Sequence, residues 1–237
     1  MENNSFLKGL KGGIPVCLGY IAVGFAFGIF AVASGLTPSA AILISMFNVT
    51  SAGQVAAVPI IVGGGTLFEL ALTQFIINLR YSLMSISLSQ KMSNNITLLD
   101  RFVIAFVNTD EVFAVAMNTS GLLGRKFLYG LIITPFVGWT LGTLLGAFAG
   151  NILPPVLITA LSMAIYGMFI AIIVPGMIKE KSTGYCVILA AAISCAFYFI
   201  PALKAIPSGF TIIICAVISA GVLAFAAPVK EGGADNE

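Results

Sequence analysis

Apolar residues fall into long runs along the chain, separated by short polar or glycine-rich stretches. A run of about 20 apolar residues is long enough to cross the hydrocarbon core of a bilayer as a helix. The pattern therefore predicts eight helical segments. These are Ile14–Ala33, Ala40–Val62, Leu67–Leu88, Phe102–Met117, Phe127–Ala149, Val156–Pro175, Tyr185–Ile200 and Phe210–Ala227.

Two of these segments are interrupted by polar residues. The second segment contains the run Asn48–Gln54 and also Pro59, and the fourth contains Asn108–Glu111. Backbone groups and carboxylates inside lipid need protein partners or water. We therefore predict that one or both of these segments are broken or re-entrant helices. Eight plain crossings are the alternative.

The composition indicates the solvent that surrounds most of the chain. Of its 237 residues, 59% are apolar and only 8% are charged, whereas a soluble domain usually carries about 25% charged residues. We predict an all-α integral membrane protein with about six to eight transmembrane segments, surrounded by lipid in a bacterial-type inner membrane. The net charge of +2 is small and the positive residues are scattered, so no nucleic-acid partner is predicted.

The basic residues indicate orientation, because cytoplasmic loops are enriched in lysine and arginine. They gather at Lys8 and Lys11, Lys91 and Arg101, Arg125 and Lys126, Lys179 and Lys181, and Lys230, while Lys204 stands alone. If the N-terminus is inside, re-entrant segments at both interrupted positions place every basic loop except that of Lys204 on the inside.

A weak internal repeat is also visible. Gly24 and Gly28 precede Pro38, as Gly142 and Gly146 precede Pro155 at nearly the same distance. We predict one membrane transporter domain, 1–237, with repeat halves at about 8–121 and 127–230, a pattern typical of transporters. Chance recurrence in glycine-rich helices is the alternative, and parallel and inverted repeats both remain open. The glycine pairs predict close helix packing.

The first candidate site is the polar run of the second segment, with Asn48, Thr50, Ser51, Gly53 and Gln54 as substrate-binding residues. A helix that restarts there points its positive N-terminal end inward, which suits a carboxylate. The alternative is that these side chains only form hydrogen bonds with neighbouring helices.

The second candidate site is the segment Leu67–Leu88. Successive residues of a helix are rotated by about 100° around its axis. On this basis the helix has two polar stripes, roughly 120° apart around the axis. The first stripe holds Glu69, Thr73, Arg80 and Ser87, and the second holds Gln74, Asn78, Tyr81 and Ser85. We predict that Asn78, Arg80 and Tyr81 bind substrate. A structural ion pair of Arg80 with Glu69 or with an acid elsewhere is the alternative.

The third candidate site is the adjacent pair Asp110 and Glu111. Neighbouring acids inside an apolar segment repel each other and are desolvated, so at least one should have a raised pKa. We predict that this pair couples transport to protons. The alternative is that the pair sits in a hydrated tip and only neutralises Arg80.

Catalytic motifs are missing from the sequence. It contains no GxxxxGK[ST] phosphate loop, no HExxH and no GxSxG, which argues against ATP hydrolysis and against the common hydrolase classes. There is no histidine, and the four cysteines show no paired metal-type spacing. We therefore predict that the chain is not an enzyme and needs no metal or cofactor.

Four stretches carry a family resemblance: Gly13–Gly24, Ser51–Gln54, Asn78–Arg80 and Thr109–Glu111. Through them the sequence resembles the AzlC family, the large subunits of branched-chain amino acid exporters, from about Phe6 to Ala227. The resemblance implies export of valine, leucine or isoleucine together with a small hydrophobic membrane subunit of the AzlD type, itself of about four helices. Tyr81 stands where many relatives have histidine, so a histidine-based proton step does not carry over.

The candidate residues fit an amino-acid substrate. The Ser51–Gln54 amides or Arg80 can donate to its carboxylate, and Asp110 or Glu111, with Asn78, can accept from its ammonium group. We predict a proton-linked exporter with a site near the middle of the membrane. A channel, a carrier for another small polar metabolite and a scaffold that transports nothing are the alternatives.

Overall fold

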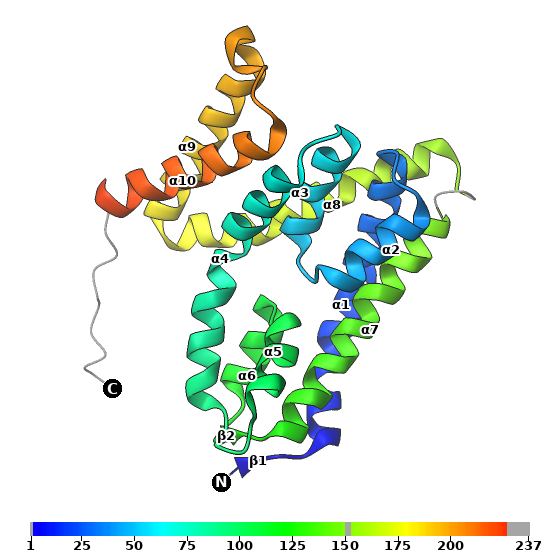
Figure 1. Ribbon diagram of the computed structural model, residues 1–237, viewed down its shortest axis with the longest axis vertical. Helices are drawn as coiled ribbons and strands as arrows, with labels where there is room; N and C mark the ends of the chain where they lie inside the picture. The colour runs from blue at the N-terminus through cyan, green and yellow to red at the C-terminus, as the bar shows by residue number, and fades with distance from the viewer. Residues whose placement is uncertain (1, 150–152, 227–237) are drawn as a thin grey trace.

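The computed structural model describes residues 2–149 and 153–226, and its helices follow the apolar runs of the sequence (Figure 1). The prediction of an all-α protein is confirmed. The helices are α1 Phe6–Ala33, α2 Pro38–Phe47, α3 Ser51–Val62, α4 Leu67–Lys91, α5 Leu98–Phe106, α6 Asp110–Asn118, α7 Arg125–Ala149, α8 Pro155–Lys179, α9 Lys181–Phe199 and α10 Ser208–Ala226, with a short 3-10 turn at Pro201–Leu203. Ala227, the last residue of the eighth predicted segment, and Lys230 lie outside the described residues.

Four of the described helices are long and apolar enough to cross a membrane, namely α1, α7, α9 and α10. Helix α4 has the same length as α7, 25 residues, but it carries Glu69, Arg80 and Lys91. A helix of this length can span the hydrocarbon core, provided that its charged side chains face protein or water. The fold is that of an integral membrane protein.

Helices α1 and α7 pack against each other in parallel, and glycines make their close approach possible. A Cβ atom on Gly24 would lie 2.6 Å from the carbonyl oxygen of Trp139, and one on Gly28 would overlap Thr143 and Ala147. Gly142 and Gly146 meet the backbone of α1 in the same way. Small residues at this spacing let two helix backbones touch, so both glycine pairs serve packing within the chain.

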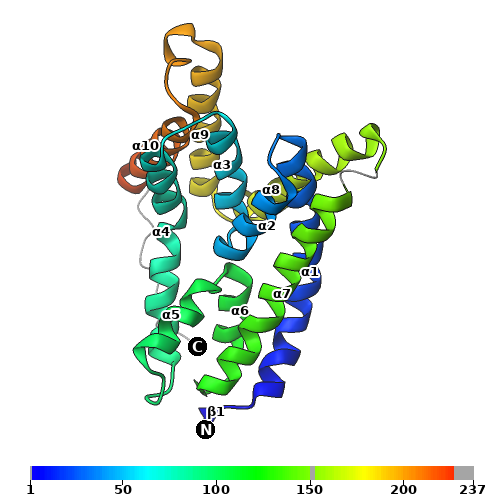
Figure 2. The same ribbon diagram turned by 45° about the vertical axis from the view of Figure 1, so that its right-hand side comes forward.

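Two helical hairpins enter the molecule from opposite ends and turn back near its middle (Figures 1 and 2). The first is α2 and α3, broken at residues 48–50, and the second is α5 and α6, broken at residues 107–109. Both breaks therefore fall where the sequence predicts them. The predicted interruption at Pro59 is wrong, because α3 continues through this residue to Val62. Prolines are tolerated in such helices when neighbouring groups satisfy the freed carbonyl. Helix α8, unlike these two hairpins, is one continuous helix.

One end of the molecule collects the start of α1, the end of α4 and the start of α7. The short strands β1 (Glu2–Asn3) and β2 (Leu122–Leu123) pair there in parallel, and the Lys91 ammonium donates a 2.5 Å hydrogen bond to the carbonyl of Met117. We call this the basic end, because it gathers the lysines and arginines of these elements and of α5. They are Lys8, Lys11, Lys91, Arg101, Arg125 and Lys126.

Asp100 ties α5 to α7 at the basic end. Its Oδ2 accepts hydrogen bonds from the amide (3.0 Å) and the hydroxyl (2.7 Å) of Thr97, which begins α5. Its Oδ1 accepts a 2.8 Å hydrogen bond from the Tyr129 hydroxyl and lies 2.9 Å from the Arg125 Nε. These contacts hold the pKa of Asp100 below its ordinary value. The hydrogen bond from the Thr97 hydroxyl has the largest effect, and Tyr129 and Arg125 also lower this pKa.

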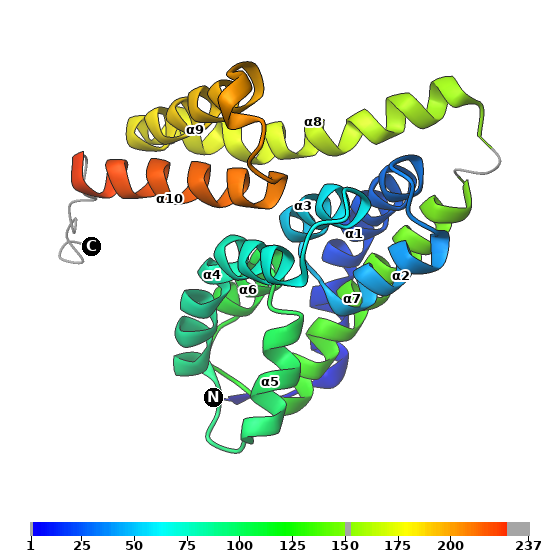
Figure 3. The same cartoon turned by 45° about the horizontal axis from the view of Figure 1, so that its top comes forward.

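Helices α8, α9 and α10 form the rest of the molecule, with α9 and α10 side by side (Figure 3). No described residue of α9 is buried, and only Gly209 and Ser219 of α10 are. The start of α10 is attached to α4, because the Gly209 amide donates a 2.8 Å hydrogen bond to the Glu69 carboxylate. Most of the surface of this helix pair is therefore left for lipid or for a partner.

Candidate functional site

Both broken hairpins resume as helices directly after a threonine. The Thr50 hydroxyl accepts a hydrogen bond from the Gly53 amide at 3.5 Å, and the Thr109 hydroxyl accepts one from the Val112 amide at 3.5 Å. Threonine suits this position because its hydroxyl pairs one of the free N–H groups in the first turn. The positive N-terminal ends of α3 and α6 thus lie at the two hairpin tips, inside the molecule.

The two tips line one cavity of about 130 Å³, which we call the tip cavity. Side chains from the middle of α1, α4 and α7 complete its wall. Its lining residues are Tyr20, Val23, Val49, Thr50, Ser51, Ala52, Arg80, Tyr81, Thr109, Asp110, Glu111 and Trp139. Helices of this length span a bilayer from end to end, so a cavity at their midpoints lies near the middle of the membrane.

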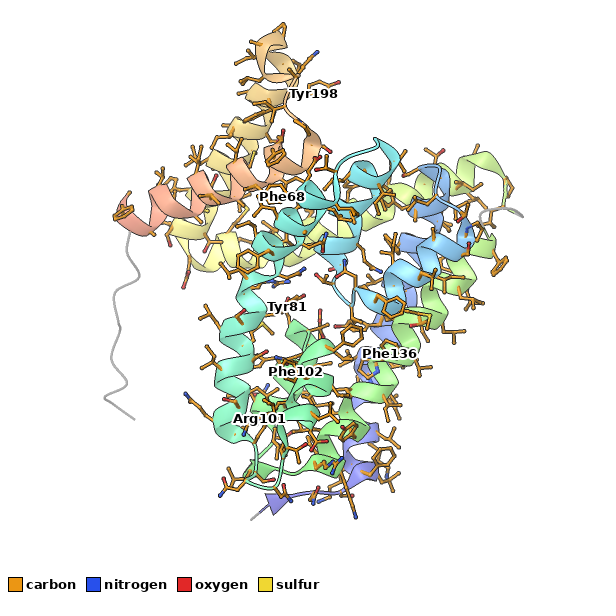
Figure 4. The ribbon with its side chains drawn as sticks, viewed as in Figure 1. Phe68, Tyr81, Arg101, Phe102, Phe136 and Tyr198 are labelled. Carbon is orange, nitrogen blue, oxygen red and sulfur yellow. The ribbon has the colours of Figure 1, made fainter. Side chains whose placement is uncertain are left out.

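Arg80 and Asp110 form an ion pair at the edge of the tip cavity. Their Nη1 and Oδ2 atoms are 2.5 Å apart, and the two side chains are 50% and 47% exposed. The Arg80 Nη2 also donates to the Tyr81 hydroxyl at 3.3 Å, and that hydroxyl donates to Thr50 at 3.4 Å. Arg80 and Tyr81 therefore connect the tip of the first hairpin to the tip of the second. Tyr81 extends from the side of α4 that faces the centre of the molecule (Figure 4).

Glu69, the other acid considered for Arg80, has a different partner. It is 2% exposed and binds the start of α10 through Gly209. The two residues are eleven positions apart on one helix, which separates them by roughly 16 Å at about 1.5 Å per residue. The acid elsewhere in the chain, Asp110, is the one that pairs with Arg80.

Tyr20 joins α1 to the second tip. Its hydroxyl lies 2.5 Å from the Thr109 hydroxyl and 2.5 Å from the Glu111 Oε2. The Tyr20 ring meets the Trp139 ring edge-on, with 4.8 Å between centroids, an arrangement that aromatic pairs prefer. Glu111 is thus held by the Tyr20 hydroxyl group, whereas Asp110 is held by the Arg80 guanidinium.

An amide cluster beside the tip cavity links α4 to the first tip. The Gln74 amide nitrogen donates to the Gly53 carbonyl at 2.8 Å, and its Oε1 accepts from Asn48 at 3.0 Å and from Asn78 at 3.3 Å. A Cβ on Gly53 would lie 2.5 Å from the Gln74 Oε1, so the close approach of this side chain requires a glycine. Asn48, Gly53 and Asn78 are therefore next to the tip cavity and not in its wall.

Gln54 lies away from the tip cavity. Its side chain is fully buried and donates a 2.6 Å hydrogen bond to Ser45, whose hydroxyl is 2.6 Å from that of Thr143. These contacts hold α3 against α2 and α7. The structure thus gathers six of the ten predicted site residues into the cavity wall, namely Thr50, Ser51, Arg80, Tyr81, Asp110 and Glu111.

The sequence analysis missed Tyr20, Thr109 and Trp139 as parts of the site. Tyr20 and Trp139 each carry one polar atom on a large ring, in the middle of helices that are long and apolar enough to cross a membrane. Trp139 is the single tryptophan of the chain, and Thr109 directly precedes the acid pair. These two signals were available, but neither shows which helices face the cavity. Within the described part of the chain, no group of three metal-binding side chains occurs.

Two discontinuous helical hairpins that meet at a polar cavity, deep within an otherwise apolar helical protein, define a class of membrane protein. In membrane transporters, broken helices place their N-terminal ends at a site near the bilayer midplane. The particular family follows from sequence. A family model described as AzlC protein matches residues 15–153, and the chain belongs to the AzlC family, a family of membrane transporters.

Individual relatives agree with this assignment. The chain is 27% identical over 229 residues to the inner membrane protein YgaZ of Escherichia coli, covering 93% of this chain and 91% of that protein. It is 31% identical over 191 residues to an uncharacterized membrane protein of Archaeoglobus fulgidus, covering 78% and 84%. No solved structure matches the chain. The predicted location in a membrane is confirmed by these relatives and by the four candidate spans.

Proposed function

We propose that the chain exports branched-chain amino acids and binds them in the tip cavity. The observation that carries this proposal is the meeting of two helix N-terminal ends with the Arg80–Asp110 pair in one mid-depth cavity. A transporter needs a polar site there that both faces of the membrane can reach in turn.

The substrate carboxylate is bound by Arg80 and by the first turn of α3. Arginine offers a planar fork that matches a carboxylate with two parallel hydrogen bonds. The start of α3 at Ser51 adds free amide groups and the positive end of a helix dipole. Asn48, Gly53 and Asn78 support this tip through the Gln74 amide, and Gln54 fixes the helix behind it.

The substrate ammonium is bound by Asp110 of the second tip. Asp110 is paired with Arg80 and is half exposed, so a zwitterion can insert between the two and replace one ion pair by two. This exchange leaves the net charge of the site unchanged, which avoids an isolated charge in a desolvated place. The proton that drives export is carried by one of the two neighbouring acids, Asp110 or Glu111.

The apolar side chain of the substrate lies against the apolar wall of the cavity. Val23, Val49 and Trp139 provide such surfaces. Ala52 lines the tip cavity and also a larger cavity of about 760 Å³, which reaches Ser34 and Gly63 at the end opposite the basic end. These two adjoining cavities favour passage of a small solute along the axis of the molecule.

A small hydrophobic membrane subunit completes the exporter. The support is the surface of α9, of which no described residue is buried, and the half-exposed Arg80–Asp110 pair, which lipid cannot cover at low cost. We expect the purified chain to be less stable and less active alone than with this subunit. Full transport by the chain alone would contradict the partner.

Labelled-valine counterflow in proteoliposomes tests the function directly. Liposomes loaded with unlabelled valine should accumulate labelled valine transiently, with and without the co-purified small subunit, and more strongly with it. A channel gives no such accumulation, because it equilibrates both pools at once. Absence of counterflow for valine, leucine and isoleucine, with counterflow for another metabolite, would reassign the substrate.

A further inference from the structure

The two neighbouring acids of the second tip have different partners. Asp110 lies 2.5 Å from the Arg80 guanidinium and forms an ion pair with it. Glu111 makes no ion pair within residues 2–149 and 153–226, and its described partner is the Tyr20 hydroxyl at 2.5 Å. The sequence presents these acids as equivalent, and the structure separates them.

The surroundings of Glu111 suit both of its protonation states. A hydroxyl group can donate or accept a hydrogen bond. Tyr20 can donate to the Glu111 carboxylate, and it can accept from the protonated acid while its own proton turns to Thr109, 2.5 Å away. A guanidinium has no acceptor atom, so Asp110 has no equivalent arrangement on the side of Arg80.

Few other titratable groups face Glu111. Tyr20 faces it from α1, Arg80 and Tyr81 line the same cavity from α4, and Asp110 precedes it on α6. Helix α7 contributes Trp139 to this wall, which does not titrate. Of these groups, the two acids are those whose ordinary pKa values lie on the acid side of neutrality.

We propose that Glu111, and not Asp110, takes up and releases the coupling proton, with Tyr20 and Thr109 as positioning residues. This assignment rests on the proton-linked transport proposed above. A hydronium ion on one side of the membrane donates the proton: one of its O–H bonds breaks and an O–H bond to a Glu111 carboxylate oxygen forms. When the site opens to the other side, that bond breaks and a water molecule there takes up the proton.

Trp139 provides a way to observe this step without measuring transport. It is the single tryptophan of the chain and is 2% exposed, and its ring lies 4.8 Å from that of Tyr20. A change in the hydrogen bond between Tyr20 and Glu111 alters the surroundings of this ring. The intrinsic fluorescence of the purified protein should therefore show a transition across the acid pH range.

The test is a pH titration of Trp139 fluorescence in wild-type protein and in variants. Asp110→Asn should keep the transition, and Glu111→Gln should abolish it. Glu111→Asp should keep it with a shifted midpoint. Tyr20→Phe should also shift the midpoint, since it removes the hydroxyl and keeps the ring beside Trp139. Loss of the transition in Asp110→Asn with retention in Glu111→Gln would overturn the assignment, as would a wild-type protein with no transition.

Counterflow separates failure of this assignment from failure of the proposed function. Exchange of labelled for unlabelled valine needs no net proton movement, so Glu111→Gln should reduce accumulation driven by a pH gradient far more than it reduces counterflow. Retention of gradient-driven accumulation in Glu111→Gln contradicts the assignment alone. A wild-type protein that titrates through Glu111 but shows no counterflow contradicts the transport proposal and leaves the proton site in place.

Discussion

Arg80 is a charged residue in the middle of α4, a helix long enough to span a membrane. An arginine at mid-depth in a bilayer costs at least about 2.5–3.5 kcal/mol unless it is paired or hydrated. The structure pairs it with Asp110 and adds a hydrogen bond to Tyr81. A half-exposed pair of this kind at a cavity is available to a charged substrate.

Replacement of Arg80 by lysine separates substrate binding from structural pairing. Arg80→Lys keeps the charge beside Asp110 but removes the two-pronged fork. Hydrogen bonds to charged groups contribute about 1.5–3 kcal/mol. The apparent KM for valine, measured by counterflow, should therefore rise by about tenfold or more. Arg101→Lys at the basic end is the matched control and should transport normally. Near-normal transport by Arg80→Lys and by Asn78→Ala would remove both residues from the substrate site.

Acid should weaken the basic end through Asp100. Its pKa is lowered in the folded protein, so it stabilises the fold above the ordinary aspartate pKa of about 3.9. That contribution is lost as the pH falls through the lowered value. The melting temperature of wild-type protein in detergent should therefore drop in this acid range, and Asp100→Asn should flatten the drop. Glu180→Gln, at an exposed carboxyl group, should leave the profile unchanged, and an equal drop in Asp100→Asn would exclude Asp100 as its source.

At the scale of elements, the parallel pair α1 and α7 is the scaffold that carries two of the three aromatic residues of the tip cavity. Tyr20 lies in α1 and Trp139 in α7, and their rings meet at 4.8 Å. This contact requires the two backbones to lie close together. The glycines of both helices therefore position the site as well as the scaffold.

Two glycines of α1 allow a matched test of that packing. A Cβ on Gly24 would lie 2.6 Å from the Trp139 carbonyl oxygen, whereas a Cβ on Gly19 meets no described atom within 4 Å. Gly24→Ala should destabilise the protein by about 1–3 kcal/mol, the usual cost of overpacking. Gly19→Ala should be neutral or slightly stabilising, since alanine favours helices. Thermal unfolding followed by circular dichroism measures both, and equal melting temperatures would argue against tight α1–α7 packing.

The threonine-capped breaks show how local chemistry produces the hairpin tips. Asn48 and Asn108 lie just after α2 and α5, the first helices of the two hairpins. Thr50 and Thr109 cap the N-terminal ends of α3 and α6, the second helices. Side chains of this kind compete with the backbone for hydrogen bonds and favour helix ends over helix interiors. Because this signal is local, the sequence reveals both breaks.

At the scale of the whole molecule, the opposite entry of the two hairpins decides the topology. It places the ends of α4 and α6 beside the starts of α1 and α7, and so brings the basic residues of the first half together at the basic end. This is the grouping that the positive-inside rule requires of a cytoplasmic face. The structure shows that these residues lie at the same end of the molecule. That this end faces the cytoplasm is a prediction.

Cysteine labelling tests that orientation. In a background without Cys17, Cys186, Cys195 and Cys215, a membrane-impermeant thiol reagent added outside should label Ser39→Cys, near the opposite end. It should label Asn95→Cys, an exposed position at the basic end, only after the membrane is permeabilised. Labelling of intact cells at position 95 would reverse the orientation.

The sequence by itself determined that lipid surrounds most of the chain. It also determined the eight apolar segments, the two breaks and the short set of polar residues from which a site is built. These features depend on local properties, namely the length of apolar runs and the capping chemistry of threonine. Only the tertiary structure decided which polar residues meet. It turned Gln54 into a packing contact, paired Arg80 with Asp110, and brought Tyr20 to Glu111 across 91 positions of sequence. Such pairs depend on how helices far apart in the sequence pack against each other, and the pattern of residues along one helix does not specify that packing.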